Sequence, residues 1–259
     1  MTLYLNKQLF KNLLPTLLIM WCLSAMGIVT AEAGTWRVSP IKVYFDVKTR
    51  SDVITVTNDG DQNLALVITA MEWAQDQDGQ DIYQPANDLV FFPKQLTVEP
   101  KKERVIRTGI KVPAVNREKT YRLFIKEVPD RSQMAPNTVA IAIQFGVPVF
   151  AKPFHEDIAG AISDEQIVDA TLSATIENKG NSHFHISTII LNGKSAAGDL
   201  LFSKEFNGWY LLNGSSRNFT TPIPDEICQQ LNVLDIQINA DQIKFNGRVD
   251  VDQTMCSVP

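Results

Sequence analysis

Apolar and polar residues alternate with a period of two through most of the chain beyond residue 34, which is the pattern of β-strands with one buried face. Residues 51–57 and 64–71 follow this period, and turn clusters occur at residues 58–61, 76–79, 99–102 and 112–113. Short strands separated by turns about every 8 to 12 residues are typical of sandwiches and barrels. No helical pattern is long enough to support alternating strand and helix units. The sequence therefore predicts an all-β fold.

The strand pattern restarts after Pro153. Predicted strands cover residues 168–176, 183–191 and 233–238, with turns at residues 178–181 and at Asn192-Gly193. The acidic stretch 155–165 is interpreted as a boundary or as the first loop of a second unit. We therefore expect two β-sandwich domains, residues 34–152 and residues 153–259.

The first 33 residues have the pattern of a secretory signal. Lys7 and Lys11 precede an apolar stretch at residues 13–29, and the motif Ala31-Glu32-Ala33 follows. Basic residues, an apolar stretch and an A-x-A site in this order predict a cleaved signal peptide. A membrane anchor is the alternative, but a polar sequence begins immediately afterwards, so we expect export and cleavage after Ala33.

The charge and the cysteine content limit the possible binding partners and the cellular compartment of the protein. The chain has 24 basic and 29 acidic residues and a net charge of -5, with no dense basic block for binding nucleic acid. Of its three cysteines, Cys22 falls in the signal peptide, so Cys228 and Cys256 remain in the exported chain. An even number of cysteines in an exported protein favours one disulfide, and no CxxC spacing is present for a metal site.

The sequence contains no familiar catalytic motif. It has no GxSxG elbow, no HExxH pair and no phosphate-binding loop. His183 and His185 share one face of a predicted strand, but without a third ligand they are interpreted as ordinary surface or core histidines. Residues 76–81 resemble a calcium loop, yet Gly79 comes too early, which favours a hairpin turn. We therefore expect a binding protein with no catalytic residue, metal, cofactor, nucleic acid or small-molecule substrate.

A long uncharged segment, residues 138–150, is the most unusual part of the chain. Its large side chains recur at every second position, at Val139, Ile141, Ile143, Phe145, Val147 and Val149. An interior strand with one face in the core is one interpretation. Pro148 favours an edge strand, because proline cannot donate to a β-ladder. An apolar edge strand invites aggregation unless it pairs with another chain, which is the second interpretation.

Several motifs follow one another in a recognisable order along the first domain. They are Val53-Ile54-Thr55-Val56-Thr57-Asn58-Asp59, Trp73, Leu96-Thr97-Val98-Glu99-Pro100 followed by Arg107, the strand at residues 121–129, and Phe150-Ala151-Lys152-Pro153. In this order and spacing the chain resembles the periplasmic pilus-assembly chaperones. Residues 177–191 are similar to the opening of their second domain, so the resemblance spans most of the exported chain.

The resemblance implies two immunoglobulin-like sandwiches that hold a pilus subunit along the last strand of the first domain. Pilus subunits are incomplete sandwiches, and the chaperone supplies the missing strand by donor-strand complementation. In this chain the donated side chains would be Val139, Ile141, Ile143 and Phe145, and Met134 would extend the contact. The resemblance also implies a periplasmic location and delivery of the subunit to an outer-membrane usher.

Well-known members of this family carry an arginine in the first strand and a lysine in the last, and these fix the terminal carboxylate of the subunit. The matching positions here hold Lys42 and Pro148, so one cation is conservatively changed and the other is missing. We therefore expect a helper cation, either Arg122 or Arg107. Arg122 is favoured because its predicted strand should neighbour the last strand.

Glu118 and Lys152 match family positions that join the two domains by charge.

Two other classes of protein remain as alternatives. A secreted immunoglobulin-like adhesin or structural pilus subunit would lack a strand or carry a donor extension, and the short lead from Gly34 to Arg37 does not resemble one. A divergent sandwich hydrolase or metal-binding protein is the other alternative.

Overall fold

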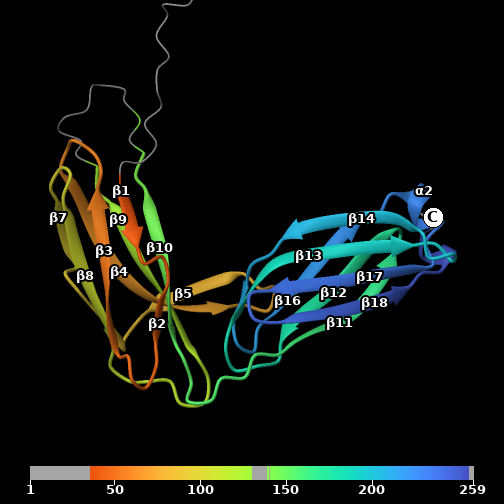
Figure 1. Cartoon of the computed structure of the whole chain (residues 1–259), viewed down its shortest axis with the longest axis horizontal. Helices are drawn as coiled ribbons and strands as arrows, with labels where there is room; N and C mark the ends of the chain where they lie inside the picture. The colour runs from red at the N-terminus through yellow and green to blue at the C-terminus, as the bar shows by residue number, and fades with distance from the viewer. Residues whose placement is uncertain (1–35, 130–138, 140, 257–259) are drawn as a thin grey trace, which may run out of the picture. The chain divides into compact units, whose positions relative to one another are not determined.

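The computed structural model describes residues 36–129, 139 and 141–256, so the predicted signal peptide lies outside it. The described residues form four β-sheets (Figure 1). Strands between Trp36 and Ala151 make two of these sheets, and strands between Gly160 and Asp250 make the other two. The predicted all-β fold with two β-sandwiches is confirmed, while the domain boundary near Pro153 stays a prediction.

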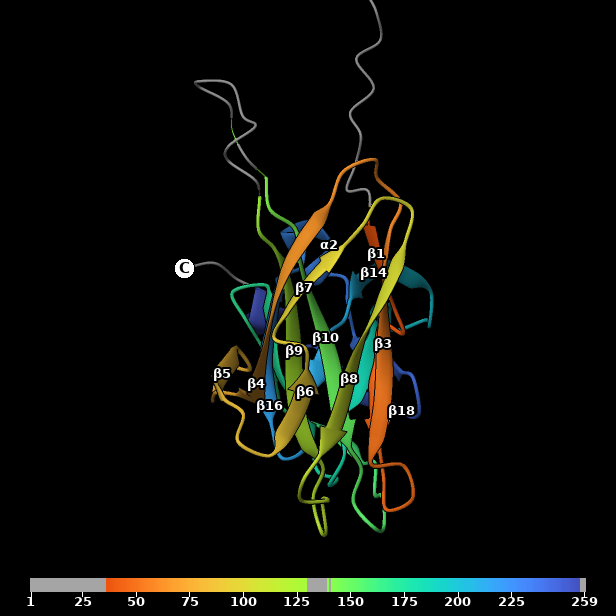
Figure 2. The ribbon, with the colours of Figure 1, turned by 90° about the vertical axis from the view of Figure 1, so that its left-hand side faces the viewer.

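The first sandwich packs a four-stranded sheet against a six-stranded one. The first sheet contains, in spatial order, β1 (Trp36–Ser39), β3 (Ser51–Asn58), β8 (Glu103–Ile110) and β6 (Leu89–Phe92). The second contains β2 (Val43–Phe45), β10 (Gln144–Ala151), β9 (Lys119–Glu127), β4 (Leu64–Gln75) and β5 (Asp81–Pro85), and β7 (Gln95–Val98) also pairs with β4. Figure 2 shows β4, β9 and β10 side by side, and these strands are antiparallel.

Alternating side chains fill the space between these two sheets. Ile54 lies opposite Ile106 in one sheet, and Ile68 lies opposite Ile125 in the other. All four are buried in a single core. Because successive side chains of a strand point to opposite faces, the polar residues between them face outward. This is why the period-two pattern located these strands.

The second sandwich has its own core. One sheet contains β11 (Gly160–Val168), β12 (Thr171–Asn178) and β16 (Ser216–Pro222). The other contains β14 (Leu200–Asn207), β13 (Phe184–Lys194), β17 (Val233–Ala240) and β18 (Lys244–Asp250), and β15 (Tyr210–Leu211) also pairs with β13. Nowhere in residues 36–129, 139 and 141–256 is there a helix long and apolar enough to cross a membrane.

The predicted disulfide is present in the second sandwich. It joins Cys228 of the short helix α2 (Asp225–Cys228) to Cys256 of the 3₁₀ turn η2 (Gln253–Cys256), with the two Cα atoms 5.6 Å apart. Both cysteines are buried and belong to the core of this sandwich. The bond therefore ties the end of the described chain to the core.

Each sandwich has a buried asparagine that organises an equivalent turn. The side-chain amide of Asn58 donates to two backbone carbonyls, and its oxygen accepts the backbone N–H of Gly60. Asn178 likewise donates to two carbonyls and accepts the N–H of Gly180. These bonds satisfy buried backbone groups, and they confirm the turns predicted after both strands.

Two predictions about the start of the second sandwich are wrong. Residues 155–165 are only partly loop, because β11 begins at Gly160. The last acidic residues of this stretch lie in a β-bulge of that strand, between Ser163 and Gln166. Residues 168–176 are not one strand, because Asp169 and Ala170 adopt positive φ and form the turn between β11 and β12. A period-two pattern continues across so short a turn, which hides the break.

Glycine marks a turn at one predicted hairpin and a bulge at the other. Gly79, with φ of 71°, lies in the tight turn between β4 and β5, as predicted. Asn192 and Gly193 are not a turn, because both lie within β13 and pair with β17. A β-carbon on Gly193 would lie 2.7 Å from the side chain of Leu231, so close packing explains this glycine.

Candidate functional site

The segment before β10 exposes two large apolar side chains. Val139 is 84% exposed and Ile141 is 83% exposed, more than any other large apolar side chain that the structure describes. Neither lies in a strand, because β10 begins only at Gln144. The strand predicted from residue 138 is therefore shorter at its start than expected. Met134 lies outside the described residues.

The next two large apolar side chains in the alternating series, Ile143 and Phe145, are less exposed than Val139 and Ile141. Ile143 and Phe145 are half-buried and pack against the core of the first sandwich. The Phe145 ring meets the Trp36 ring edge-on, with the centroids 4.6 Å apart. Ile143 and Phe145 thus contact their own sandwich rather than standing free, because the core reaches this far. The face continues beyond the core only at Ile141 and Val139.

The first half of β10 has an open backbone edge. β9 pairs with the whole strand, Gln144–Ala151, but β2 pairs only with Val149, Phe150 and Ala151. Among the described residues no strand pairs with the other edge of residues 144–148. Pro148 lies on this open stretch, as expected for a residue without a backbone N–H. An extended chain can add to such an edge through backbone hydrogen bonds.

Lys42 and Arg122 approach the same aromatic ring. The Nζ atom of Lys42 is 5.2 Å from the centroid of the Tyr210 ring, and the guanidinium carbon of Arg122 is 5.7 Å from it. Arg122 also lies 3.8 Å over the ring of Trp73 and donates from Nη1 to the carbonyl of Gly146 on β10 at 2.9 Å. The structure therefore brings the two predicted anchor cations together beside β10.

Tyr210 also affects the charge of Lys42. A hydrogen bond with the Tyr210 side chain raises the pKa of Lys42, although partial burial acts in the opposite direction. Burial and the nearby Lys42 lower the pKa of His185, whose ring lies 4.7 Å from that of Tyr210. At neutral pH the ammonium group is therefore charged and the imidazole is neutral.

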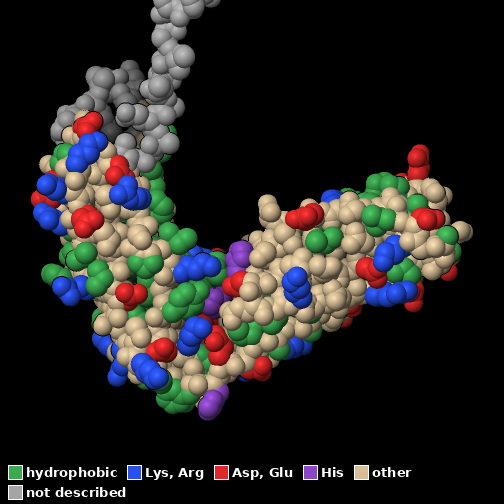
Figure 3. Space-filling model, in the orientation of Figure 1, with side chains coloured by type: hydrophobic (Ala, Val, Ile, Leu, Met, Phe, Trp, Pro, Cys, Tyr) green, Lys and Arg blue, Asp and Glu red, His purple; other side chains and the backbone are tan. Residues whose placement is uncertain are grey.

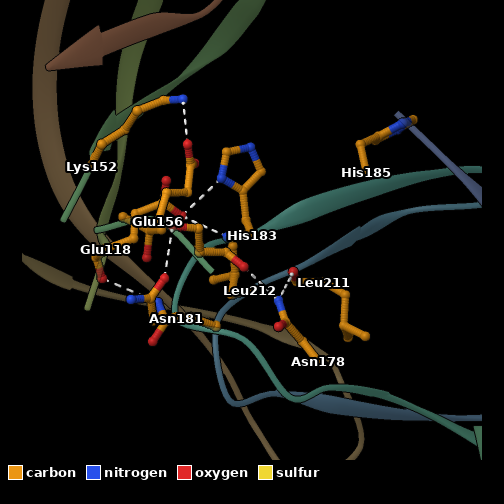
Figure 4. Close-up of polar contacts among 12 residues, drawn as sticks. Glu118, Lys152, Glu156, Asn178, Asn181, His183, His185, Leu211 and Leu212 are labelled. Carbon is orange, nitrogen blue, oxygen red and sulfur yellow. Dashed lines mark hydrogen bonds and ion pairs between the residues drawn. The ribbon is translucent and has the colours of Figure 1, made fainter. Parts of the chain in front are cut away.

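A buried hydrogen-bonded pair joins the two sandwiches. Glu118, just before β9, accepts the backbone N–H of His183 at 2.9 Å, and the same carboxylate oxygen is 2.8 Å from Nδ1 of His183 (Figure 4). The side chains of Glu118 and His183 are 0% and 2% exposed. The His183 ring stacks on Phe150 of β10, with the centroids 3.5 Å apart. His183 is therefore a core histidine that contacts both sandwiches.

Lys152 does not pair with Glu118. Its Nζ atom lies 3.0 Å from the carboxylate of Glu156, four residues further along the chain (Figure 4). Glu118 contacts the second sandwich through His183, and the role of Glu118 and Lys152 in joining the domains by charge stays a prediction. The two side chains do not meet because Glu118 is enclosed where the backbone and ring of His183 point at it, whereas Lys152 stays partly exposed.

His185 lies apart from the buried Glu118–His183 pair. Figure 4 shows His185 pointing away from Glu118, and the backbone N–H of His185 donates to Asp241 instead. On the face seen in Figure 3, histidine side chains lie beside basic and acidic ones. Within the described ranges, however, no group of three His, Cys, Asp or Glu side chains is arranged to hold a metal ion.

Comparison with known families gives a match over the first sandwich. Residues 36–155 match the family described as "Pili and flagellar-assembly chaperone, PapD N-terminal domain". The first sandwich therefore belongs to this family of N-terminal chaperone domains. A comparison with curated proteins finds no significant match.

Solved structures of pilus-assembly chaperones have a similar fold. The class 5 fimbriae chaperone CfaA is 17% identical, with 82% of this chain and 98% of CfaA covered and a TM-score of 0.54. The chaperone–tip subunit complex CsuC–CsuE of Acinetobacter baumannii gives 15% identity and a TM-score of 0.52. The match covers 72% of this chain and 90% of the matched chain. The complex of SafA pilin with the SafB chaperone of Salmonella enterica gives 11% identity and a TM-score of 0.53. The match covers 84% of this chain and 98% of the matched chain.

Sequence patterns did not single out Tyr210 and Arg217, which line a cavity together with Arg122. Tyr210 belongs to β15, a strand of only two residues, where no alternation can be recognised. Arg217 of β16 lies 4.4 Å over the ring of Trp209. The available signal was the adjacent pair Trp209-Tyr210, two large aromatics in a segment otherwise rich in turn-forming residues.

Proposed function

We propose that this chain is a periplasmic chaperone that captures a pilus subunit along the segment before β10 and delivers it to an outer-membrane usher. One observation carries the proposal. Val139 and Ile141 are almost fully exposed, and they directly precede a strand with an open edge whose same face forms the sandwich core.

This arrangement suits a partner that lacks a strand. The backbone of the partner would add to the open edge of β10, and its groove would cover Val139 and Ile141. Fully burying a Val or Ile side chain contributes roughly 1.5 to 3 kcal/mol, so the two contribute about 3 to 6 kcal/mol before the cost of ordering the segment. A subunit held in this way can be released by exchange with a better-fitting strand, which needs no nucleotide.

The two cations beside β10 are proposed to bind the terminal carboxylate of the subunit. Arg122 presents a planar fork that matches a carboxylate, whereas Lys42 acts as a point charge. Both approach the ring of Tyr210, and the guanidinium of Arg122 already bonds the carbonyl of Gly146. The contact of Arg122 with β10 supports Arg122, rather than Arg107, as the helper cation.

Delivery to an usher needs a second surface that stays accessible while β10 is occupied. The outer face of the other sheet offers one. Phe92, 73% exposed, lies opposite Arg107, and Arg107 lies opposite Val53. Val90 of β6 and Val105 of β8 are exposed as well, and residues of β3, β6 and β8 line a hollow of about 270 Å³. We assign the usher contact to this apolar face, since a chaperone without a partner here would expose it to water.

Export and domain organisation complete the proposal. Cleavage after Ala33 would leave Gly34 as the first residue of the mature protein, with domains at residues 34–152 and 153–259. N-terminal sequencing of protein purified from the periplasm tests the first part. A protein that retains its leader in the membrane fraction would contradict it.

Co-expression with candidate subunits tests the capture step. The parent chain should yield a soluble one-to-one complex, and the variant Val139→Asp/Ile141→Asp should yield none while its circular dichroism spectrum stays unchanged. Leu200→Asp on β14 is the matched control, because this exposed apolar side chain lies in the other sandwich. A folded double variant that still captures the subunit would overturn the proposal.

A further inference from the structure

Four large apolar side chains are exposed on three loops at one end of the first sandwich. The loops follow β2 (residues 46–50), β8 (residues 111–118) and β10 (residues 152–159), and Figure 1 shows them together at the lower end of this sandwich. Val47, Val115 and Phe154 are each 52% exposed, and Val112 is 54% exposed. We call these three loops the loop tip.

Hydrogen bonds hold the three loops together. The backbone N–H of Phe154 donates to the carbonyl of Val115 at 3.1 Å, which joins the third loop to the second. The Arg50 guanidinium donates to the carbonyl of Lys111 at 2.6 Å, which joins the first loop to the second. Apolar side chains scattered singly over a surface need no explanation, but these four form one group.

Basic side chains surround this apolar group. Four of them are exposed on the first two loops: Lys48, Arg50, Lys111 and Arg117. Among the residues that the structure describes, none of the four forms an ion pair. Two of them adjoin exposed valines, because Lys48 follows Val47 and Lys111 precedes Val112. On the face seen in Figure 3, apolar and basic side chains adjoin at this end.

Acidic side chains offset only part of this charge. The carboxylate of Asp46 accepts two backbone N–H groups of its own turn. Glu118 is buried, and Glu156 is paired with Lys152. Asp157 is exposed on the third loop. The exposed surface of the loop tip therefore keeps more basic than acidic groups.

We propose that the loop tip docks on a phospholipid surface that contains anionic headgroups. Exposed apolar side chains next to Lys and Arg are typical of proteins that lie in a membrane interface. The apolar groups enter the boundary of the acyl chains, while the long basic side chains keep their charges among the headgroups. Because the four side chains lie on loops, they can enter this boundary without any strand of the sandwich opening.

Lipid docking would leave the capture segment accessible. Val139 and Ile141 precede β10, whereas the third loop of the tip follows its last residue, Ala151. The eight residues of β10 span about 26 Å at the usual rise of an extended strand, so the two surfaces lie at opposite ends of this strand. The inference goes beyond the proposed function and does not depend on it.

Vesicle flotation tests the docking. The mature protein should bind vesicles of phosphatidylethanolamine and phosphatidylglycerol, and it should bind vesicles of phosphatidylcholine alone about tenfold more weakly. Val112→Asp/Val115→Asp should lower binding to the anionic vesicles about tenfold, because it replaces two inserted apolar groups with charges. No binding by the parent, or equal binding by this variant, would overturn the proposal.

A matched control separates position from charge. Val168→Asp/Leu200→Asp adds the same two charges at exposed apolar positions of the second sandwich, and it should bind within about threefold of the parent, because screening weakens distant charges. A loss as large as that of Val112→Asp/Val115→Asp would show that net charge, rather than the loop tip, decides binding. Circular dichroism spectra of both variants should match that of the parent.

The basic side chains have a test of their own. Lys48→Gln/Lys111→Gln should weaken binding to the anionic vesicles and leave binding to phosphatidylcholine vesicles unchanged. Equal losses on the two kinds of vesicle would contradict a contact between these cations and anionic headgroups.

Two other results would assign the surfaces differently. If Val139→Asp/Ile141→Asp loses vesicle binding while Val112→Asp/Val115→Asp keeps it, the segment before β10 contacts the lipid and the proposal is wrong. If the parent binds no vesicles but forms a dimer that Val112→Asp/Val115→Asp abolishes in analytical ultracentrifugation, the loop tip binds a second copy and the proposal is also wrong. Subunit capture by Val112→Asp/Val115→Asp should equal that of the parent, so failure of either proposal leaves the other standing.

Discussion

The carboxylate of Glu118 contacts His183 twice, through the backbone N–H at 2.9 Å and through Nδ1 at 2.8 Å. Both side chains are almost completely buried. Glu118 precedes a strand of the first sandwich and His183 precedes a strand of the second. A single buried acceptor thus connects the strand next to β10 with the second sandwich.

Removing this acceptor should destabilise the chain. Glu118→Ala leaves two donors of His183 buried without a partner, so we expect the free energy of unfolding to fall by about 2 to 4 kcal/mol. Urea denaturation followed by tryptophan fluorescence measures the change. Glu156→Ala is the control, because its pair with Lys152 is partly exposed and contributes less than about 1 kcal/mol. Equal losses in the two variants would contradict a special role for Glu118.

Phe145 should contribute more to the stability of the first sandwich than to contact with a partner. Phe145→Ala removes the edge-on contact with Trp36 and part of the core packing, so we expect a loss of about 2 kcal/mol in unfolding free energy. Ile141→Ala should change stability by less than about 0.5 kcal/mol, because Ile141 is exposed. If thermal or urea denaturation shows the two variants to be equally stable, Phe145 does not belong to the core of the first sandwich.

Asp88 should make stability depend on pH in the acid range. Burial favours the neutral form of Asp88, but hydrogen bonds from Lys119 and Tyr121, each 2.6 Å long, outweigh it and lower its pKa. A pKa lower in the folded than in the unfolded state stabilises the fold above the unfolded value, about 3.9, and this contribution disappears as pH falls through the folded value.

Asp88→Asn should therefore be less stable than the parent at pH 7, and the difference should shrink below about pH 4. Denaturant titrations at several pH values measure it. Asp61→Asn is the control, because Asp61 is exposed and its replacement should shift stability by less than about 0.5 kcal/mol. A difference for Asp88→Asn that is constant from pH 7 to pH 3 would show that its charge is not involved.

The disulfide should stabilise the second sandwich. Cys228 and Cys256 are 28 positions apart, and closing a loop of this length contributes roughly 3 to 4 kcal/mol in the chain-entropy model. Cys228→Ala/Cys256→Ala should lose about this amount, and the parent treated with a reductant should approach the same value. Two reactive thiols in the untreated denatured protein would contradict the bond.

Sequence patterns located most strands because one face of each is buried. β3 and β17 appear nearly where the alternation predicted them, and the hairpin at Gly79 is recognisable from its turn residues. The same patterns could not show where β10 begins, because the alternation at residues 138–150 is the same inside and outside the core. Alternation reports which side chains share a face, and it does not report what covers that face.

Long-range contacts were the other limit. Nothing in the local sequence of His183 distinguishes a partner of Glu118 from an ordinary strand histidine, since the two are brought together only by the packing of separate sandwiches. Arg217 was missed for the same reason, because it reaches the cavity beside Arg122 from a distant strand. The resemblance to the chaperone family identified Glu118, although its contact is His183 and not Lys152. Arg122 was predicted as a helper cation from the expected position of its strand beside the last strand, and β9 does pair with β10.

Hydrogen–deuterium exchange of the chaperone with and without its subunit tests the central claim most directly. Residues 139–147 include the two most exposed side chains and much of the open edge of β10. We predict that the amides of this segment that do not pair with β9 exchange rapidly in the free chaperone and become protected in the complex, because they enter a ladder with the subunit. A stable complex in which these residues exchange as fast as in the free protein would contradict capture along this segment.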